Sequence, residues 1–308
     1  MNQNQYIKDA DVSGFINFLK ETIKKEEFPD RSQSCSDHGT LQNNKTIGRY
    51  KNLKDAFLNY QWNNKNYCEN VVILSDLNKQ LISAVDRNDD AAAFITACRI
   101  IDWGGVQKCL SGLINKYSDN NLLGCIKDGA KYLTATHDAD LDKFGNDKII
   151  MNAGWTKIYS VLNANTIIYD GRVGSALCSL VRVFLGSKCN NQKLSIPDNL
   201  AFTWGPGQGT ADRDPNCSQC MNGNKLFMKH SPNDGKLWAK SNLYANWILA
   251  DVVADQDVID RISHWANNCK IQTPEDRLRA LEASLFMLGE NAGSAVCKKF
   301  PSKRQRKP

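Results

Sequence analysis

The sequence predicts a mainly α-helical protein with few or no strands. Apolar residues recur every three or four positions along most of the chain, which is the spacing of one helix face. Capping residues precede several of these runs. Only two short segments, TIIY and VVIL, favour strands. Hydrophobic residues make up 42% and charged residues 23% of the 308 residues, an ordinary globular composition with enough apolar side chains for a large core.

The N-terminal helical region is predicted to cover residues 1–88. An amphipathic pattern opens it, and a shorter pattern lies within a polar, Asn-rich stretch. A third pattern follows a serine and an aspartate that suit a helix cap. The three predicted helices span residues 11–25, 53–60 and 75–88.

Residues 89–297 are predicted to form the helical core. Two aspartates precede the apolar run AAAFITACRII, and Gly104-Gly105 can stop that helix. The run GRVGSALCSLVRVFL is strongly apolar and typical of a buried helix. Residues 186–236 are dense in Gly, Pro and Asn and form a long predicted loop, which in a compact domain is usually functional or mobile. Further helices are expected over residues 106–117, 237–256 and 273–291.

A lysine and an aspartate stand out in the segment NAGWTKIYSVLNANTIIYDGRV. Lys157 follows a turn at Gly154 and falls in the first turn of a predicted helix, where the positive dipole disfavours a cation. The dipole and partial burial predict a lowered lysine pKa and hence a nucleophilic amine. Asp170 falls at the N-cap of the next helix, where amides favour its ionised form. The turn amides also predict a phosphate site.

Such a pair suits attack on a glycosidic carbon. The carboxylate stabilises the oxocarbenium character that develops there, and the amine can form a Schiff base with the sugar. The alternative for each residue is purely structural: Lys157 a solvated helix lysine, and Asp170 a plain cap.

The segments A-G-W-T-K and I-I-Y-D-G-R-V-G-S-A-L resemble two motifs of the helix-hairpin-helix DNA glycosylases, the 8-oxoguanine branch in particular. A broader likeness to bacterial proteins of this fold covers roughly residues 90–290 and includes DWGGV and RLRALEASLFMLG. Ala153 and Trp155 replace the two glycines of the family's G-V-G-T-K hairpin, and the family's four-cysteine iron–sulfur loop is absent from the sequence.

The resemblance implies a DNA glycosylase that extrudes and excises a base from double-stranded DNA. It makes Lys157 the nucleophile, with lyase action at the abasic sugar as an option, and Asp170 its assistant. The substrate stays open between oxidised guanine and a bulky base such as glucosylated hydroxymethylcytosine of phage DNA, which would indicate an anti-phage role. No cofactor or metal is expected.

Several further side chains are candidates for binding DNA. Gly154, Trp155 and Thr156 form the turn, and Arg172 could meet a phosphate or form an exposed salt bridge. Trp155 at the turn, or Trp204 in the long loop, could stack on the extruded base, and His137 could line the cleft.

The last eleven residues, 298–308, form a predicted basic tail. The net charge is +6, and the six basic residues of the tail account for all of it, since 6 − 6 = 0. Such a tail can add sequence-independent affinity for phosphates or serve only as a solubilising segment. The tail residues that are predicted to bind DNA are Lys298, Lys299, Lys303 and Arg304.

The eleven cysteines are scattered, mostly within apolar patterns. With no export signal and no apolar run long enough to span a membrane, we expect a cytoplasmic monomer whose thiols are reduced rather than joined in disulfides. Two alternatives to an enzyme remain: a non-enzymatic DNA-binding protein, and an interaction module in which Cys217 and Cys220 bind zinc with Cys189 and His230.

Overall fold

The computed structural model describes residues 1–29, 46–145, 149–186, 194–207, 209, 211–216, 226–231 and 234–293. These residues confirm the mainly helical class: they contain helices joined by loops and isolated bridges, with no sheet among them. The α-helices are α1 (Gln3–Ile7), α2 (Ala10–Lys25), α3 (Leu53–Leu58), α4 (Tyr67–Asp86), α5 (Asp90–Trp103), α6 (Leu110–Ser118), α7 (Leu122–Leu133), α8 (Trp155–Leu162), α9 (Gly171–Gly186), α10 (Gly235–Ala254), α11 (Gln256–Ile262) and α12 (Pro274–Leu288). Three short 3-10 helices are η1 (Gln107–Cys109), η2 (Leu141–Lys143) and η3 (Asp198–Leu200).

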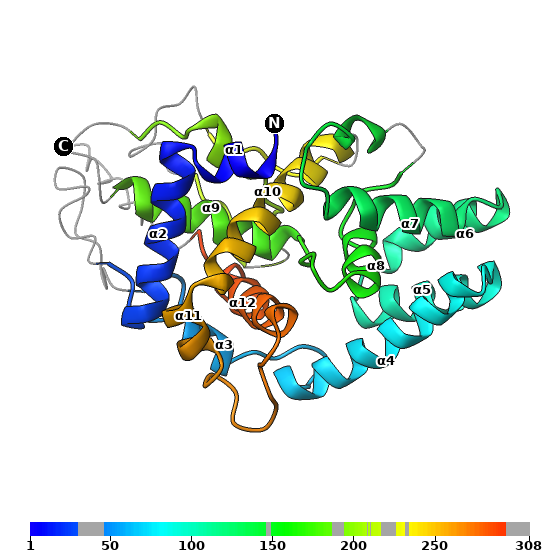
Figure 1. Ribbon diagram of the computed structural model, residues 1–308, viewed down its shortest axis with the longest axis horizontal. Helices are drawn as coiled ribbons and strands as arrows, with labels where there is room; N and C mark the ends of the chain where they lie inside the picture. The colour runs from blue at the N-terminus through cyan, green and yellow to red at the C-terminus, as the bar shows by residue number, and fades with distance from the viewer. Residues whose placement is uncertain are drawn as a thin grey trace, which may run out of the picture.

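The helices form two groups (Figure 1), which contact each other through α10 and α7. One group contains α2, α3, α9, α10 and α11, and α12 packs against α3, α9 and α10 within it. The other group contains α4 to α8, in which α4 contacts both α5 and α8. Lys157 lies in α8, and the chain that passes from α8 to α9, from one group to the other, ends at Asp170.

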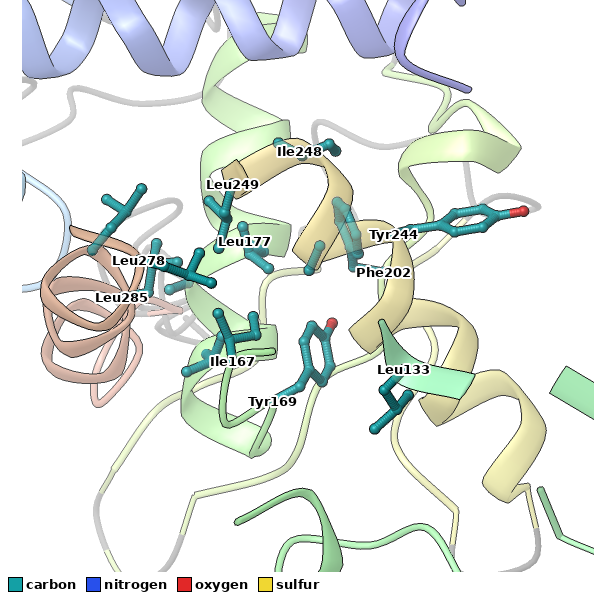
Figure 2. Packing of buried hydrophobic residues seen from close by; sticks show 14 of the residues in the cluster. Leu133, Ile167, Tyr169, Leu177, Phe202, Tyr244, Ile248, Leu249, Leu278 and Leu285 are labelled. Atoms are coloured by element: carbon teal, nitrogen blue, oxygen red, sulfur yellow. The ribbon is translucent and has the colours of Figure 1, made fainter. Parts of the chain in front are cut away.

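Buried apolar side chains form one core cluster that runs from Tyr6 in α1 to Ala292 after α12. Figure 2 shows part of it, where Leu177 of α9, Leu249 of α10 and Leu285 of α12 lie close together. The N-terminal region therefore shares its core with the remainder of the chain. No described helix is long and apolar enough to cross a membrane.

Capping explains where two helices begin. Thr273 caps α12 in a capping box with Asp276, and proline occupies the first helical position, as predicted. Asn66 forms a capping box with Glu69, so α4 begins at Tyr67, eight residues before Ser75. The segment VVIL lies inside α4, and its prediction as a strand was wrong.

The other strand-like segment, TIIY, is extended but has no partner strand. Its backbone amides are satisfied by buried side chains instead. The Ile167 amide donates to Asn246 Oδ1 at 2.9 Å, and the Ile168 amide donates to Glu282 Oε2 at 2.8 Å. The Tyr169 amide donates to Thr156 Oγ1 at 2.9 Å. These bonds fix the path of the chain immediately before Asp170.

One cysteine expectation needs correction. Cys68 in the first turn of α4 and Cys269 before α12 form a disulfide, with their Cα atoms 5.6 Å apart. Four other cysteines are free thiols, namely Cys98, Cys109, Cys125 and Cys178. The thiols are therefore not all reduced, and the expected cytoplasmic location stays a prediction.

Candidate active site

Lys157 occupies the first turn of α8, as the sequence predicts. The turn before it is closed by Asn152, whose Oδ1 accepts the amides of Gly154 at 2.9 Å and Trp155 at 3.1 Å. The Thr156 amide donates to the Asn152 carbonyl at 3.0 Å. Because these amides already have partners, a phosphate could bind the turn only by displacing Asn152, and the predicted phosphate site at Gly154 is not free.

The predicted hairpin also differs from the structure in its first arm. Between η2 and α8, the described residues form an extended segment and a turn, with Phe144 and Ile149 in an isolated bridge. An α-helix does not directly precede the turn within these residues. Lys157 therefore lies after a loop capped by Asn152, and the helix-hairpin-helix arrangement itself is not shown.

Asp170 caps α9, as the sequence predicts. Its Oδ1 accepts the amides of Arg172 at 2.9 Å and Val173 at 3.2 Å, and its carbonyl accepts the amide of Gly174 at 3.0 Å. Two amides on one carboxylate oxygen fix the orientation of the group. The second oxygen, Oδ2, is left to face Lys157.

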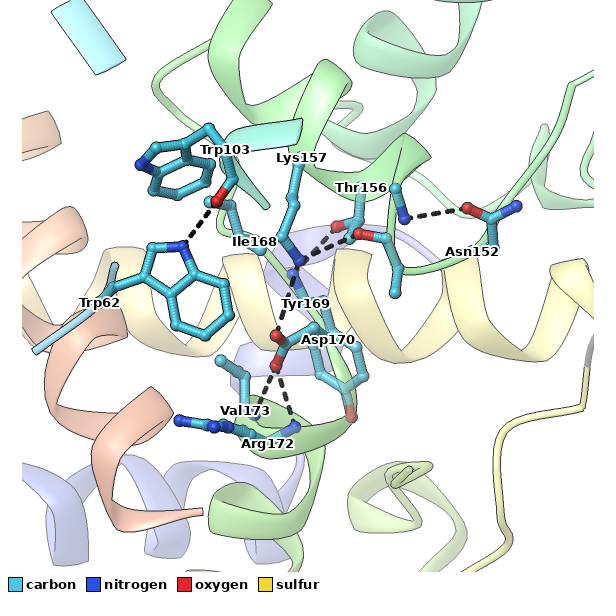
Figure 3. Close-up of polar contacts among 12 residues, drawn as sticks. Trp62, Trp103, Asn152, Thr156, Lys157, Ile168, Tyr169, Asp170, Arg172 and Val173 are labelled. Atoms are coloured by element: carbon cyan, nitrogen blue, oxygen red, sulfur yellow. Dashed lines mark hydrogen bonds and ion pairs between the residues drawn. The ribbon is translucent and has the colours of Figure 1, made fainter. Parts of the chain in front are cut away.

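The two side chains meet (Figure 3). Lys157 Nζ lies 3.6 Å from Asp170 Oδ2 and donates to the Ala153 carbonyl at 3.1 Å. The lysine side chain is 5% exposed and the aspartate side chain 13% exposed. Because this ion pair is well shielded from water, the electrostatic interaction between its two charges is strong. This burial excludes the alternative that Lys157 is a solvated helix lysine.

Gly104 makes room for the stem of Lys157. A Cβ at position 104 would lie 2.4 Å from Lys157 Cδ and 2.7 Å from Cε. Gly104 has φ −74° and ψ −8°, a conformation open to any residue, so its backbone does not require glycine. The next residue, Gly105, has φ +62° and does. Glycine at position 104 therefore serves the packing of Lys157.

The pair lies at the wall of a narrow pocket with a cavity volume of about 30 Å³. The pocket brings together parts of the chain that are far apart in sequence: the segment before α4, α4 itself, the end of α5, and α12. Aromatic rings dominate its lining. The lining side chains are Tyr60, Trp62, Tyr67, Asn70, Val71, Leu74, Trp103, Lys157, Ile168, Asp170, Arg279, Glu282, Ala283 and Phe286.

Hydrogen bonds hold two indole rings in the pocket wall. Trp62 Nε1 donates to the Trp103 carbonyl at 2.7 Å (Figure 3), and Trp103 Nε1 donates to Asn70 Oδ1 at 2.9 Å. Asn70 in turn donates to three backbone carbonyls, so its amide orientation is determined. The ring of Phe286 lies edge-on to Trp62 at 5.4 Å between centroids. Rigid, mostly apolar rings of this kind suit a planar ligand.

A second carboxylate lies in the pocket. Burial raises the pKa of the Glu282 carboxyl, and the nearby Arg279 opposes that shift. Oε2 of Glu282 accepts from Arg279 and from the Ile168 amide, whereas Oε1 makes no hydrogen bond among the described residues. The Tyr60 hydroxyl is likewise unpaired there, and burial raises its pKa. These polar atoms are available to a ligand.

Several predicted contacts are corrected by burial. Trp155 and Thr156 are completely buried, so neither side chain reaches DNA; Thr156 Oγ1 also accepts from Asn242. Trp204 is buried with its Nε1 donating to the Phe227 carbonyl, and it does not line the pocket. His137 is exposed, pairs with Asn2 in a bridge, and lies outside the pocket.

Arg172 forms a salt bridge, which is one of the two roles considered for it, and its contact with a phosphate stays a prediction. Its guanidinium pairs with Glu290 at 3.5 Å and lies 4.4 Å from the Phe286 ring centroid.

The basic tail, with Lys298, Lys299, Lys303 and Arg304, lies outside the described residues. The zinc candidates Cys217, Cys220 and Cys189 also lie outside them. His230, the fourth candidate, is half-buried and stacks on Trp238 at 3.7 Å between centroids.

Comparisons of the chain with protein-family models, with curated proteins and with solved structures gave no match.

Proposed function

We propose that the protein is a DNA glycosylase that extrudes a damaged or modified base and cleaves its N-glycosidic bond. The observation that carries this proposal is the shielded Lys157–Asp170 pair, 3.6 Å apart, in the wall of an aromatic pocket. An amine and a fixed carboxylate at the edge of a slot for a planar ring are the groups that base excision requires.

Asp170 acts in its ionised form. As the C1′–N bond breaks, the base leaves with the bonding electrons and takes up a proton, while positive charge develops on the sugar. Asp170 Oδ2 faces this position because Oδ1 is held by the amides of α9. A preorganised carboxylate in a water-poor site stabilises such a charge strongly.

Lys157 acts as the nucleophile after its ammonium gives one proton to the departing base. Its nitrogen forms a bond to C1′ as the base departs, and opening of the sugar ring then yields a Schiff base. Breaking of the strand at the 3′ side would follow from this intermediate. The stem of Lys157 is confined between α8 and Gly104, so the amine approaches along a fixed line.

The aromatic lining favours a base as the ligand. The rings of Trp62 and Phe286 offer stacking surfaces, while Glu282 and Tyr60 offer polar atoms to the edge of the base. Oxidised guanine and a bulky modified cytosine of phage DNA remain the two substrate candidates. The protein would act in DNA repair with the first and in anti-phage defence with the second.

The proposal is tested by measuring the bases released from DNA. Purified protein is incubated with oxidised plasmid DNA and with phage DNA that carries glucosylated hydroxymethylcytosine, and small molecules are analysed by mass spectrometry. We expect one modified base to be released by the wild type and not by the double variant Lys157→Gln/Asp170→Asn. Arg261→Gln, on α11 outside the pocket, is the matched control and should match wild type. Release of no base from either DNA would contradict the proposal.

A further inference from the structure

Arg172 is held at the rim of the pocket, two residues after Asp170. Its side chain is 19% exposed, pairs with Glu290 at 3.5 Å, and packs on the Phe286 ring. The guanidinium has five N–H donors, so one ion pair with a carboxylate leaves donors free. The position is thus suited to a second anionic partner close to Asp170.

A second arginine is brought to the same place by a different part of the chain. The carbonyl of Arg213 accepts from Ser175 Oγ at 2.6 Å, and Ser175 lies one turn after Arg172 on α9. The neighbouring Asp212 amide donates to Asn291 at 3.3 Å, next to Glu290. Arg213 is therefore fixed between the start of α9 and the end of α12, where Arg172 also lies.

Arg213 has too few acceptors for its charge. Its Nε is buried and has no hydrogen-bond partner among the described residues, and its Nη1 makes only a long bond of 3.4 Å to the Pro206 carbonyl. Burial lowers the pKa of Arg213, and the nearby positive charge of Arg172 adds to this effect. Two guanidinium groups that repel each other in a partly buried place need an anion between them.

The carboxylates nearest to Arg213 are engaged by other groups. Glu290 is shared by Arg49 at 3.7 Å and Arg172 at 3.5 Å, and Asp170 is engaged by Lys157. The aspartates on either side of Arg213 accept amides within their own loop. Asp170 and Glu290 are thus each engaged by another cation, and no ion pair joins either of them to Arg213 among the described residues.

We propose that Arg172 and Arg213 form a site for one phosphodiester group of DNA next to the extruded nucleotide. A phosphate offers several oxygens, which match the planar fork of each guanidinium and relieve the repulsion between the two. The site adjoins Asp170, so a phosphate bound there holds the sugar beside the carboxylate. This inference rests on the proposed function for its ligand, and it gives the backbone contact that the capped turn at Asn152 cannot provide.

The test couples one arginine to one phosphate. Fluorescence anisotropy measures the affinity for duplexes that contain a tetrahydrofuran abasic analogue, with a neutral methylphosphonate on its 5′ side, on its 3′ side, or at a distant position. We expect one flanking methylphosphonate to weaken wild-type binding about tenfold, the effect of losing a charged hydrogen bond. Arg213→Gln should show the same loss on unmodified DNA and no further loss with that methylphosphonate.

The salt dependence gives a second readout. Arg213→Gln should lower the slope of log affinity against log salt by roughly 0.9, the value for one phosphate contact. Arg261→Gln should keep the full sensitivity to the flanking methylphosphonate. Equal sensitivity of wild type and Arg213→Gln to every methylphosphonate would overturn the inference, whether or not the protein releases a base. Because the duplex contains no base at the site, this binding result is independent of glycosylase activity.

Discussion

Gly104 lies directly against the stem of Lys157: a Cβ at position 104 would lie 2.4 Å from the Cδ of the lysine. The contact joins the end of α5 to the first turn of α8. The atoms that would collide belong to a flexible side chain rather than to backbone, so the lysine is the group that would move. The missing side chain of Gly104 thus sets the position of the amine relative to Asp170.

Gly104→Ala should therefore reduce the covalent reaction and leave the fold intact. The backbone conformation of Gly104 suits alanine, so the free energy of unfolding should change by less than about 1 kcal/mol. Displacing the amine by about 1 Å should slow formation of the trapped adduct by roughly 100-fold. Gly105→Ala is the control: its φ of +62° makes it lose stability while the lysine stem is untouched. Wild-type trapping rates in Gly104→Ala would show that the glycine does not position Lys157.

Asp170→Asn separates the charge of the carboxylate from its role as a cap. Asparagine caps helices well, so α9 should keep its start. Without the negative charge next to the sugar, the rate of base release should fall by about 10² to 10³. Single-turnover kinetics on the substrate identified by mass spectrometry measures this rate. An unchanged rate would show that Asp170 is only a cap.

The same variant predicts a stability coupling between the two residues. Asp170→Asn leaves the buried ammonium of Lys157 without its counter-charge, which should lower the free energy of unfolding by up to about 3 kcal/mol. Adding Lys157→Gln removes that charge and should restore part of the loss. Urea unfolding of the two single variants and the double variant measures the coupling. Strict additivity would show that the pair does not interact.

The helices and the two site residues were predictable because their signals are local. The turn at Gly154 and the apolar run before Asp170 suffice to place Lys157 in the first turn of α8 and Asp170 at the cap of α9. The TIIY segment was assigned a strand preference, but its amides are satisfied by side chains from α10 and α12, which no local pattern reveals. The segment is therefore extended, as a strand would be, but it has no partner strand among the described residues.

The pocket could not be predicted from local patterns. Trp62 and Phe286 are more than two hundred residues apart in the chain, and only the tertiary fold brings their rings together. The sequence pointed instead to Trp155 and Trp204, which are both buried. Asn152 was missed although an Asn two residues before a glycine turn is a recognisable capping signal. Such a signal could have shown that the turn amides are occupied.

His230 predicts a loss of stability in acid. Burial lowers its pKa from 6.5 to about 3, so the folded protein holds this imidazole neutral. The unfolded chain binds the proton first as pH falls below about 6.5, and stability then drops by up to about 1.4 kcal/mol per pH unit until about pH 3. Comparing wild type with His230→Gln by urea unfolding between pH 7 and 4 isolates the contribution. Parallel pH curves for the two proteins would contradict the assignment.

The Cys68–Cys269 disulfide predicts a redox-dependent stability. It ties the first turn of α4, beside the pocket residue Tyr67, to the segment before α12. Removing it should cost about 2 to 5 kcal/mol. Dithiothreitol should lower the thermal midpoint of wild type to that of Cys68→Ser/Cys269→Ser and leave the double variant unchanged. Equal midpoints of the oxidised wild type and the double variant would show that the bond contributes nothing to stability.

The central claim is that Lys157 attacks the sugar of an extruded nucleotide, and reductive trapping tests it most directly. Wild-type protein is incubated with DNA that carries the excised base in the presence of borohydride, and the adduct is digested and mapped by mass spectrometry. We predict a covalent protein–DNA adduct on Lys157, with none formed by Lys157→Gln. Base release without an adduct, or an adduct on another residue, would contradict the account.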